Sequence, residues 1–280
     1  MIDISARTRI LAWLAAMPFL IVILMFELAP LLAVAANSIQ TETSFSLSNY
    51  GEILTSKFYL GSFKVSFLIS IATALIGLGV GLPAAVLLRR MPGRVQQFVV
   101  ICSNIGANFT GFPLAFSFVI MLGVSGSFTL LLQRIGLLED FNIYSTSGLV
   151  IAYSYFQILF AILLVLPSLA AITTEIEEAA HLVGASRFAF WRRIGLPILA
   201  PSLLGSFLLL FANAMGTYAT AWALVGGSAN VVTIRIGELT AGDVFSDPYL
   251  ADALAMLLVV SLILPIVVEQ MFLKTKNTDR

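Results

Sequence analysis

The sequence of 280 residues is poor in the side chains that most site chemistry requires, with one cysteine, Cys102, and one histidine, His181. A single cysteine excludes an internal disulfide framework and any cysteine-based metal cluster. Charged residues make up 11% of the chain, against about 25% in a typical soluble domain. Hydrophobic residues make up 59%, more than one water-soluble core can bury. The zero net charge gives no indication of a nucleic-acid partner, and the composition indicates an integral membrane protein.

Long apolar runs predict the fold class. A membrane-spanning helix needs about 20 mostly apolar residues, and transmembrane β-strands would instead be short and alternating. We therefore predict an all-α polytopic protein with six transmembrane helices. The predicted spans cover residues 10–35, 60–88, 95–122, 147–172, 198–225 and 250–273. The first run follows two arginines, as in a signal peptide, but it is too long for a signal-peptide core, so we expect a retained helix.

The distribution of basic residues predicts the orientation. Eleven of the 15 lysines and arginines fall near the two termini and in alternate loops, and four fall on the other side. Because cytoplasmic loops carry the excess of Lys and Arg, both termini are expected in the cytoplasm. On the outer side, we expect short helices within residues 40–59 and 128–138, and a loop at 226–249.

The longest cytoplasmic segment, residues 173–197, has the pattern of a helix–turn–helix. Thr174 followed by Glu177 is a capping-box pattern, which predicts a helix start. Ala179, Ala180 and Val183 are expected to form a small, smooth face, and Gly184 is suited to end the helix in the left-handed conformation.

A second short helix is predicted over residues 187–194. Ser186 can cap it, and Pro197 suits the first turn of the fifth span. Phe188, Phe190 and Trp191 are expected to form an exposed aromatic knob near the bend. Such an ordered cytoplasmic structure indicates a docking site for a partner.

The same segment carries a motif of fixed spacing, EAA-x3-G-x9-I-x-LP, without a mismatch. It resembles the EAA loop of permease subunits of binding-protein-dependent ABC importers with the type I (MetI-like) fold. The alternative is an ordinary amphipathic connector that matches at these positions by chance. The resemblance implies coupling to the ATPase by Glu178, Ala179, Ala180, Gly184, Ile194, Leu196 and Pro197.

The resemblance also implies location and partners. It implies a multi-pass protein of the bacterial cytoplasmic (inner) membrane that works with a cytoplasmic ABC ATPase dimer. A second permease subunit, identical or homologous, and a periplasmic or extracellular solute-binding protein complete the expected importer. The chain lacks the G-x4-GK[ST] phosphate-binding motif, so ATP hydrolysis is expected on the separate ATPase, with no cofactor or metal on this chain. The expected parts are a first helix with its outer loop (1–59), a transmembrane core (60–273) and a cytoplasmic tail (274–280).

Polar residues within the spans are candidates for a translocation path, because they are costly in a membrane. Asn108 lies in the predicted third span, and Asn213, Thr217 and Thr220 recur at i, i+4 and i+7 in the fifth, which would place them on one helix face. The other interpretation is hydrogen bonding between closely packed helices.

Two other function classes compete with an importer subunit. An ion-coupled secondary transporter would be expected to carry an acidic site near the bilayer centre, and a membrane enzyme would be expected to carry a cluster of catalytic side chains. The sequence shows neither. The pattern from Asn108 to Pro113 is similar to permeases of the polyamine, iron, thiamine and phosphonate group, and we predict a small amino-bearing solute such as a polyamine.

Overall fold

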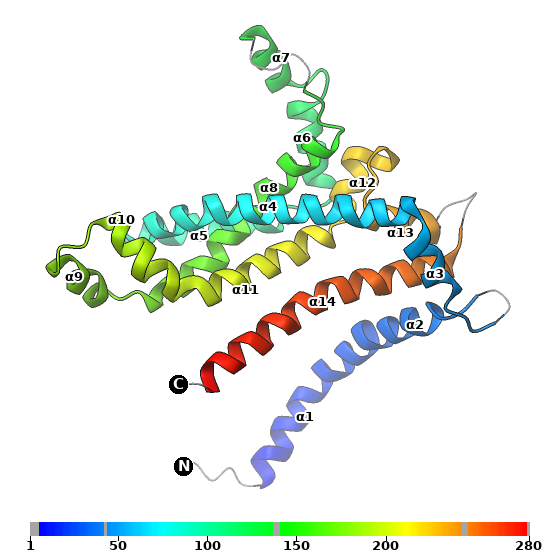
Figure 1. The fold of residues 1–280 in the computed structure, drawn as a ribbon, viewed down its shortest axis with the longest axis horizontal. Helices are drawn as coiled ribbons and strands as arrows, with labels where there is room; N and C mark the ends of the chain where they lie inside the picture. Colours follow the sequence, from blue (N-terminus) through cyan, green and yellow to red (C-terminus); the bar gives the residue numbers. More distant parts are fainter. Residues whose placement is uncertain (1–5, 42–43, 137–140, 242–245, 279–280) are drawn as a thin grey trace. The chain divides into compact units, whose positions relative to one another are not determined.

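The computed structural model describes residues 6–41, 44–136, 141–241 and 246–278, and within these ranges the chain is helical without a β-strand (Figure 1). The only pairing of extended residues there is an isolated bridge between Gln40 and Phe45. Six described segments are long and apolar enough to cross a membrane, which confirms the predicted all-α fold with six candidate spans. They are Trp13–Asn37, Lys57–Arg89, Phe112–Arg134, Thr146–Ala171, Arg187–Met215 and Pro248–Val267.

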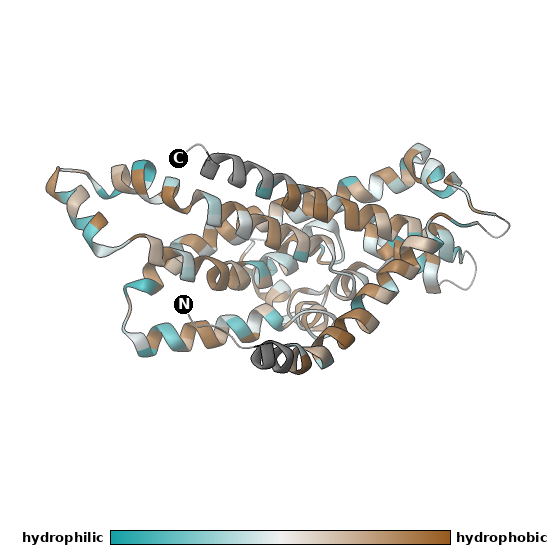
Figure 2. Ribbon diagram, turned by 90° about the horizontal axis from the view of Figure 1, so that it is seen from below, coloured by the Kyte–Doolittle hydropathy of each residue, from teal (hydrophilic) through white to brown (hydrophobic). Residues whose placement is uncertain are grey.

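The chain divides into two units. One falls within Met1–Lys57 and Ile236–Val259, and the other within Phe58–Arg235 and Val260–Arg280. Figure 2 shows hydrophobic residues along the long helices and hydrophilic residues gathered towards the helix ends, as expected for helices that contact lipid.

The first unit begins with helix α1 (Ala6–Ile23), the π-helical turn η1 (Leu24–Leu28) and α2 (Ala29–Asn37). The π-turn precedes Pro30, whose ring lacks an N–H and clashes with the carbonyl four residues earlier, and Ala29 donates to Leu24 five residues back. The predicted short helix is confirmed as α3 (Ser48–Thr55). It is tied to the end of α2, because Tyr50 donates from its hydroxyl to Ser38 Oγ at 2.8 Å.

The remaining helices follow in chain order, and α13 and α14 each run from one unit into the other. They are α4 (Lys57–Arg89), α5 (Gly93–Asn108), α6 (Phe112–Leu122), α7 (Ser127–Arg134), α8 (Thr146–Ser168), η2 (Leu169–Ala171), α9 (Thr174–Leu182), α10 (Arg187–Phe190), η3 (Trp191–Gly195), α11 (Leu196–Met215), α12 (Ala219–Val225), η4 (Gly226–Ser228), α13 (Val232–Ala241) and α14 (Pro248–Thr278).

The predicted third span was wrong in its limits. Residues 95–122 form two helices, α5 and α6, and the candidate span is Phe112–Arg134, made by α6 and α7. The helix breaks at Gly111, whose φ of 76° is left-handed, just before Pro113 at the start of α6. Pro113 has no backbone N–H to donate and lies in the first turn of α6, the part of a helix that accommodates proline, so the apolar run is divided into two helices here.

The predicted fifth span is also divided, since α11 ends at Met215 and α12 begins at Ala219. Breaks at membrane depth require partners for the freed backbone groups. The Gly111 N–H donates to Thr220 Oγ1 at 2.7 Å, so a side chain of α12 satisfies the break before α6. The Thr217 carbonyl accepts from the Tyr153 hydroxyl at 3.0 Å and from Thr233 Oγ1 at 3.2 Å.

Two further predictions concern the outer segments and the tail. The short helix within 128–138 is confirmed as α7 for its described part. The loop expected at 226–249 was wrong, because Val232, Thr233 and Ile234 are buried and start α13. Residues 242–245 and 279–280 lie outside the described residues. The predicted tail, 274–280, is helical as far as Thr278.

Small residues allow α4 to pack closely on α8. A Cβ atom built at Gly81 would lie 2.6 Å from the Ala161 Cβ, and one at Gly77 would lie 3.0 Å from the Gln157 carbonyl oxygen. These two glycines are spaced as in the small-xxx-small pattern that brings membrane helices together. Buried apolar residues then form two clusters, one around the helix breaks and one beside the cytoplasmic segment.

Candidate functional site

The cytoplasmic segment begins with α9, which starts at Thr174 as predicted but without the predicted capping box. Thr173 is the N-cap residue, in extended conformation and without a side-chain cap hydrogen bond. The Thr173 side chain instead hydrogen-bonds to the Glu175 carboxylate, which lowers the pKa of Glu175. The capping-box prediction was wrong because Glu177 turns away from the helix start and pairs with two arginines.

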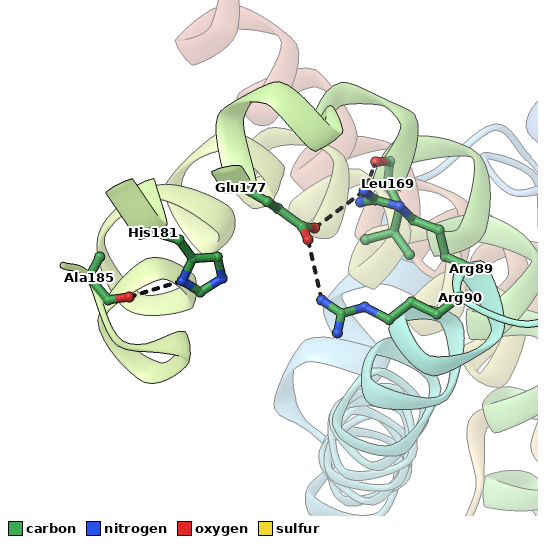
Figure 3. Close-up of polar contacts among 6 residues, drawn as sticks. All are labelled: Arg89, Arg90, Leu169, Glu177, His181 and Ala185. Carbon is green, nitrogen blue, oxygen red and sulfur yellow. Dashed lines mark hydrogen bonds and ion pairs between the residues drawn. The ribbon is translucent and has the colours of Figure 1, made fainter. Parts of the chain in front are cut away.

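These arginines close α4, and they were counted in the sequence only as topology signals. Arg89 Nη2 lies 3.2 Å from Glu177 Oε1, and Arg90 Nη2 lies 3.3 Å from Glu177 Oε2 (Figure 3). Arg89 also donates from Nη1 to the Leu169 carbonyl at 3.2 Å. One guanidinium therefore connects the end of α4, the end of α8 and the first turns of α9.

The turn after α9 is a Schellman motif, in which a left-handed residue closes the helix. Gly184 has φ 80°, which confirms its predicted left-handed conformation. Its N–H donates to the His181 carbonyl at 2.9 Å, and the Ala185 N–H donates to the Ala180 carbonyl at 3.0 Å. His181 Nδ1 lies 3.2 Å from the Ala185 carbonyl oxygen (Figure 3), so its ring covers the same turn.

The second helix starts as predicted. Ser186 Oγ accepts from the Ala189 N–H at 3.2 Å, which confirms its capping role. The helix does not stop at residue 194, because α10, η3 and α11 follow one another without a break. Pro197 lies in the first turn of α11, as predicted. Proline has no backbone N–H to donate, and in the π-turn before it the Leu196 N–H donates to the Trp191 carbonyl five residues back.

The aromatic knob was predicted wrongly for two of its three residues. Phe190 is buried in the cytoplasmic apolar cluster, and Trp191 is half-buried against it. Phe188 is exposed as predicted, together with Leu182 and Val183 at the turn, and we call Leu182, Val183 and Phe188 the exposed bend. Their exposed fractions are 89%, 83% and 75%. The smooth face was also wrong, because Ala180 is buried whereas Ala179 and Val183 are exposed.

The motif residues fall into two groups in the structure. Ala180 and Ile194 pack on the cytoplasmic cluster, Ala180 fully buried and Ile194 half-buried. The exposed group consists of Glu178, Ala179, Gly184, Leu196 and Pro197. Buried positions fix the segment to its own subunit, and the exposed ones remain accessible to a partner.

The polar residues of the spans do not share one helix face. Asn213 is exposed, and the Thr217 hydroxyl donates to the Asn213 carbonyl at 2.7 Å. Thr220 lies on a separate helix and is fully buried against Gly111, so the prediction of a common face with Asn213 and Thr217 was wrong. The helix break between Met215 and Ala219 is the cause. Asn108 is exposed and donates to the Asn104 carbonyl at 2.9 Å.

Comparison with known proteins defines the class. Residues 77–273 match the model of the family described as binding-protein-dependent transport system inner membrane component. The match covers more than half of the chain, and the chain belongs to this family. It is thus a multi-pass inner-membrane component, as the resemblance implied.

Curated relatives agree at the level of the family. The chain is 25% identical to the ferric transport system permease protein FbpB of Actinobacillus pleuropneumoniae, over 90% of this chain and 37% of that protein. It is 26% identical to the sulfate transport system permease protein CysT of Salmonella typhimurium, over 67% of this chain and 66% of that protein. The chain therefore spans under two fifths of the length of the ferric permease.

Solved structures confirm the type I importer fold. A bacterial ABC transporter involved in the import of the acidic polysaccharide alginate superposes with a TM-score of 0.75 at 15% identity, covering 96% of each chain. The MetNI methionine ABC transporter, in inward-facing conformations, superposes with a TM-score of 0.59 at 18% identity, covering 77% of this chain and 94% of that one.

Proposed function

We propose that the chain is the membrane-spanning permease subunit of an ATP-driven importer and forms half of the translocation pathway. The observation that carries this proposal is the exposed bend, which holds three large apolar side chains out from an ordered cytoplasmic turn. Exposed apolar patches on an ordered surface mark interaction sites. The partner proposed for this one is a cytoplasmic ABC ATPase.

The exposure of the motif residues supports different roles for them within the proposed docking segment, residues 173–197. Glu178 is exposed beside the exposed bend and is proposed to meet a basic or polar group of the ATPase. Ala179 is exposed on the same helix and leaves room for close approach. Ala180 and Ile194 fix the segment to the cytoplasmic cluster, Gly184 forms the turn, and Leu196 with Pro197 joins the segment to α11.

The partners of the proposed importer follow from this role. An ATPase dimer would occupy the cytoplasmic side and carry out the ATP hydrolysis. A second permease subunit, identical or homologous, would complete the pathway, and a periplasmic or extracellular solute-binding protein would deliver the solute. Support comes from the similar alginate importer, which was solved in complex with a periplasmic protein bound to an alginate pentasaccharide.

Copurification tests the proposal, and the Leu182→Asp variant makes it specific. A charge placed at the most exposed residue of the exposed bend is expected to lower ATPase affinity at least thirtyfold, since central interface anchors contribute about 2 kcal/mol or more. The measurement is the molar ratio of ATPase to tagged permease after affinity purification from the native membrane.

Phe45→Asp is the matched control, because Phe45 is an apolar residue of similar exposure, 76%, that lies between α2 and α3 and outside the candidate spans. Its ATPase ratio is expected to equal that of the wild type. A wild-type chain that retains no ATPase, or a Leu182→Asp chain that retains it fully, would contradict the proposed docking surface.

The pathway residues remain a proposal. We propose that Asn108, Asn213 and Thr217 line the path, whereas Thr220 serves the fold by holding the break at Gly111. Joint replacement of Asn213 and Thr217 by valine is expected to reduce solute uptake severalfold with the amount of folded protein unchanged. Normal uptake by this double variant would contradict the pathway role.

The cargo also remains a proposal. Relatives are named for ferric, sulfate and thiamine transport, and these solutes differ in charge, so the names do not indicate one kind of solute. A small amino-bearing solute such as a polyamine is the proposed cargo, and binding of spermidine by the partner solute-binding protein would support it.

A further inference from the structure

Two adjacent carboxylates of α9 have different surroundings. Glu178 is exposed, whereas the Glu177 side chain is 19% exposed and pairs with two arginines of its own subunit. Neighbouring residues on a helix point about 100° apart, so a single helix can face a partner and its own subunit at once. Glu177 therefore belongs to the inner side of the segment, separate from the exposed bend.

Arg89 is the centre of this inner contact. Its two terminal nitrogens serve different elements, Nη1 the Leu169 carbonyl and Nη2 the Glu177 carboxylate, both at 3.2 Å. The Leu169 carbonyl lies just past the end of α8 and also accepts from the Ile172 N–H at 3.1 Å, so Arg89 adds a second hydrogen bond to the same oxygen. The flat guanidinium fork can make both bonds in a fixed geometry, which a lysine ammonium cannot reproduce.

The surrounding dipoles and burial strengthen the contact. Arg89 lies in the last turn of α4, and Glu177 lies in the first turn of α9, so each charge is on the favourable end of its helix. The Arg89 side chain is 26% exposed, against 51% for Arg90, so the Arg89 bond is the less screened of the two.

We propose that Arg89 and Glu177 form a coupling clamp that transmits displacement of α9 into α4. Apart from this clamp, α9 and α4 share the cytoplasmic apolar cluster, in which Ala180 of α9 and Ala85 of α4 are buried, and such apolar contacts are non-directional. With the clamp in place, α4 moves with the docking segment. The close packing of Gly77 and Gly81 against α8 then carries that motion to α8. The inference rests on the proposed function, and both residues act as positioning residues.

The experiment uses the complete complex of permease and copurified ATPase in lipid nanodiscs, with MgATP and orthovanadate as the probe. Hydrogen–deuterium exchange is measured on two cytoplasmic segments, residues 84–92 at the end of α4 and 194–204 at the start of α11. In the wild type, vanadate trapping is expected to change exchange in both segments. In Glu177→Gln and in Arg89→Lys, the change at 84–92 is expected to fall at least threefold, with that at 194–204 retained.

Two matched variants control for charge and side-chain type. Glu175→Gln removes a carboxylate from the same helix, and Arg90→Lys makes the same exchange at the neighbouring arginine, which has a single ion pair to Glu177. Both are expected to keep the wild-type response in the two segments. Exchange without nucleotide is expected to be the same in all five proteins, which separates a transmission role from a structural one.

The outcomes distinguish the clamp from the proposed function. A wild-type permease that copurifies with no ATPase would overturn the proposed function. A wild-type complex whose response at 84–92 is absent, or persists in Glu177→Gln and Arg89→Lys, would overturn the clamp alone. The clamp would also be overturned if hydrogen exchange at 84–92 without nucleotide rose in Arg89→Lys by as much as the vanadate-dependent change fell. The contact would then only stabilise the fold.

Discussion

Replacement of Gly81 by valine is expected to destabilise the folded chain by about 3 kcal/mol, at the upper end of the cost of overpacking a core. A Cβ at this position would already lie 2.6 Å from the Ala161 Cβ, and valine adds two methyl groups. Because Ala161 and its backbone belong to α8, relief requires the two helices to separate. The purified protein in detergent would be heated to a series of temperatures, and size-exclusion chromatography would measure the folded protein that remains. The loss of stability would appear as a lower Tm.

Gly79→Val provides the control within the same helix. No atom lies within 4 Å of a Cβ built at Gly79, which is exposed two residues before Gly81. This variant is expected to unfold within about 0.5 kcal/mol of the wild type, as surface substitutions do. Equal Tm values for the two variants would show that α4 and α8 do not depend on the glycine contact.

Replacement of Gly184 by valine is expected to weaken ATPase binding about tenfold or more. No atom crowds a Cβ at Gly184, so the penalty comes from its φ of 80° alone. A left-handed backbone costs a non-glycine residue about 1–2 kcal/mol, and β-branched residues are genuine outliers there. The turn would then open in most molecules, and apparent affinity falls with the fraction that is competent to bind. Titration of the permease with purified ATPase measures this.

Asparagine at position 184 separates backbone strain from other effects. Asparagine is tolerated in the left-handed conformation at helix ends, so Gly184→Asn is expected to bind the ATPase within about threefold of the wild type. If asparagine and valine weakened binding equally, the effect would arise from the added side chain, and the role assigned to the turn would be contradicted.

Local sequence signals predicted the local features of the site. The turn at Gly184 and the cap at Ser186 depend on neighbours within a few residues, and both are present. The positions of most spans followed from long apolar runs. The break at Gly111 also had a local signal in Pro113, two residues later. Hydropathy alone did not reveal it, because a continuous apolar run has the same hydropathy whether it forms one helix or two.

Features that depend on distant residues were missed. The Glu177 pairings join residues 87 and 88 positions apart, so the local capping box was the only partner visible in the sequence. Phe190 was expected outside because no local pattern indicates that helices α4 and α8 supply a cluster to receive it. The buried partner of Gly111, Thr220, lies 109 positions away, and its hydroxyl was therefore assigned to a shared face.

Helix α10, the π-turn η3 and helix α11 follow one another without a break, so the end of the cytoplasmic segment and the candidate membrane span form one continuous helical element. Arg187 to Met215 comprises 29 residues, or about 43 Å at 1.5 Å per residue. A tilt of about 5° over that length would move the far end by roughly 4 Å, by the same geometry. That far end is where α11 gives way to the break at Thr217, so a small rotation at the cytoplasmic end of α10 would displace Asn213 and Thr217.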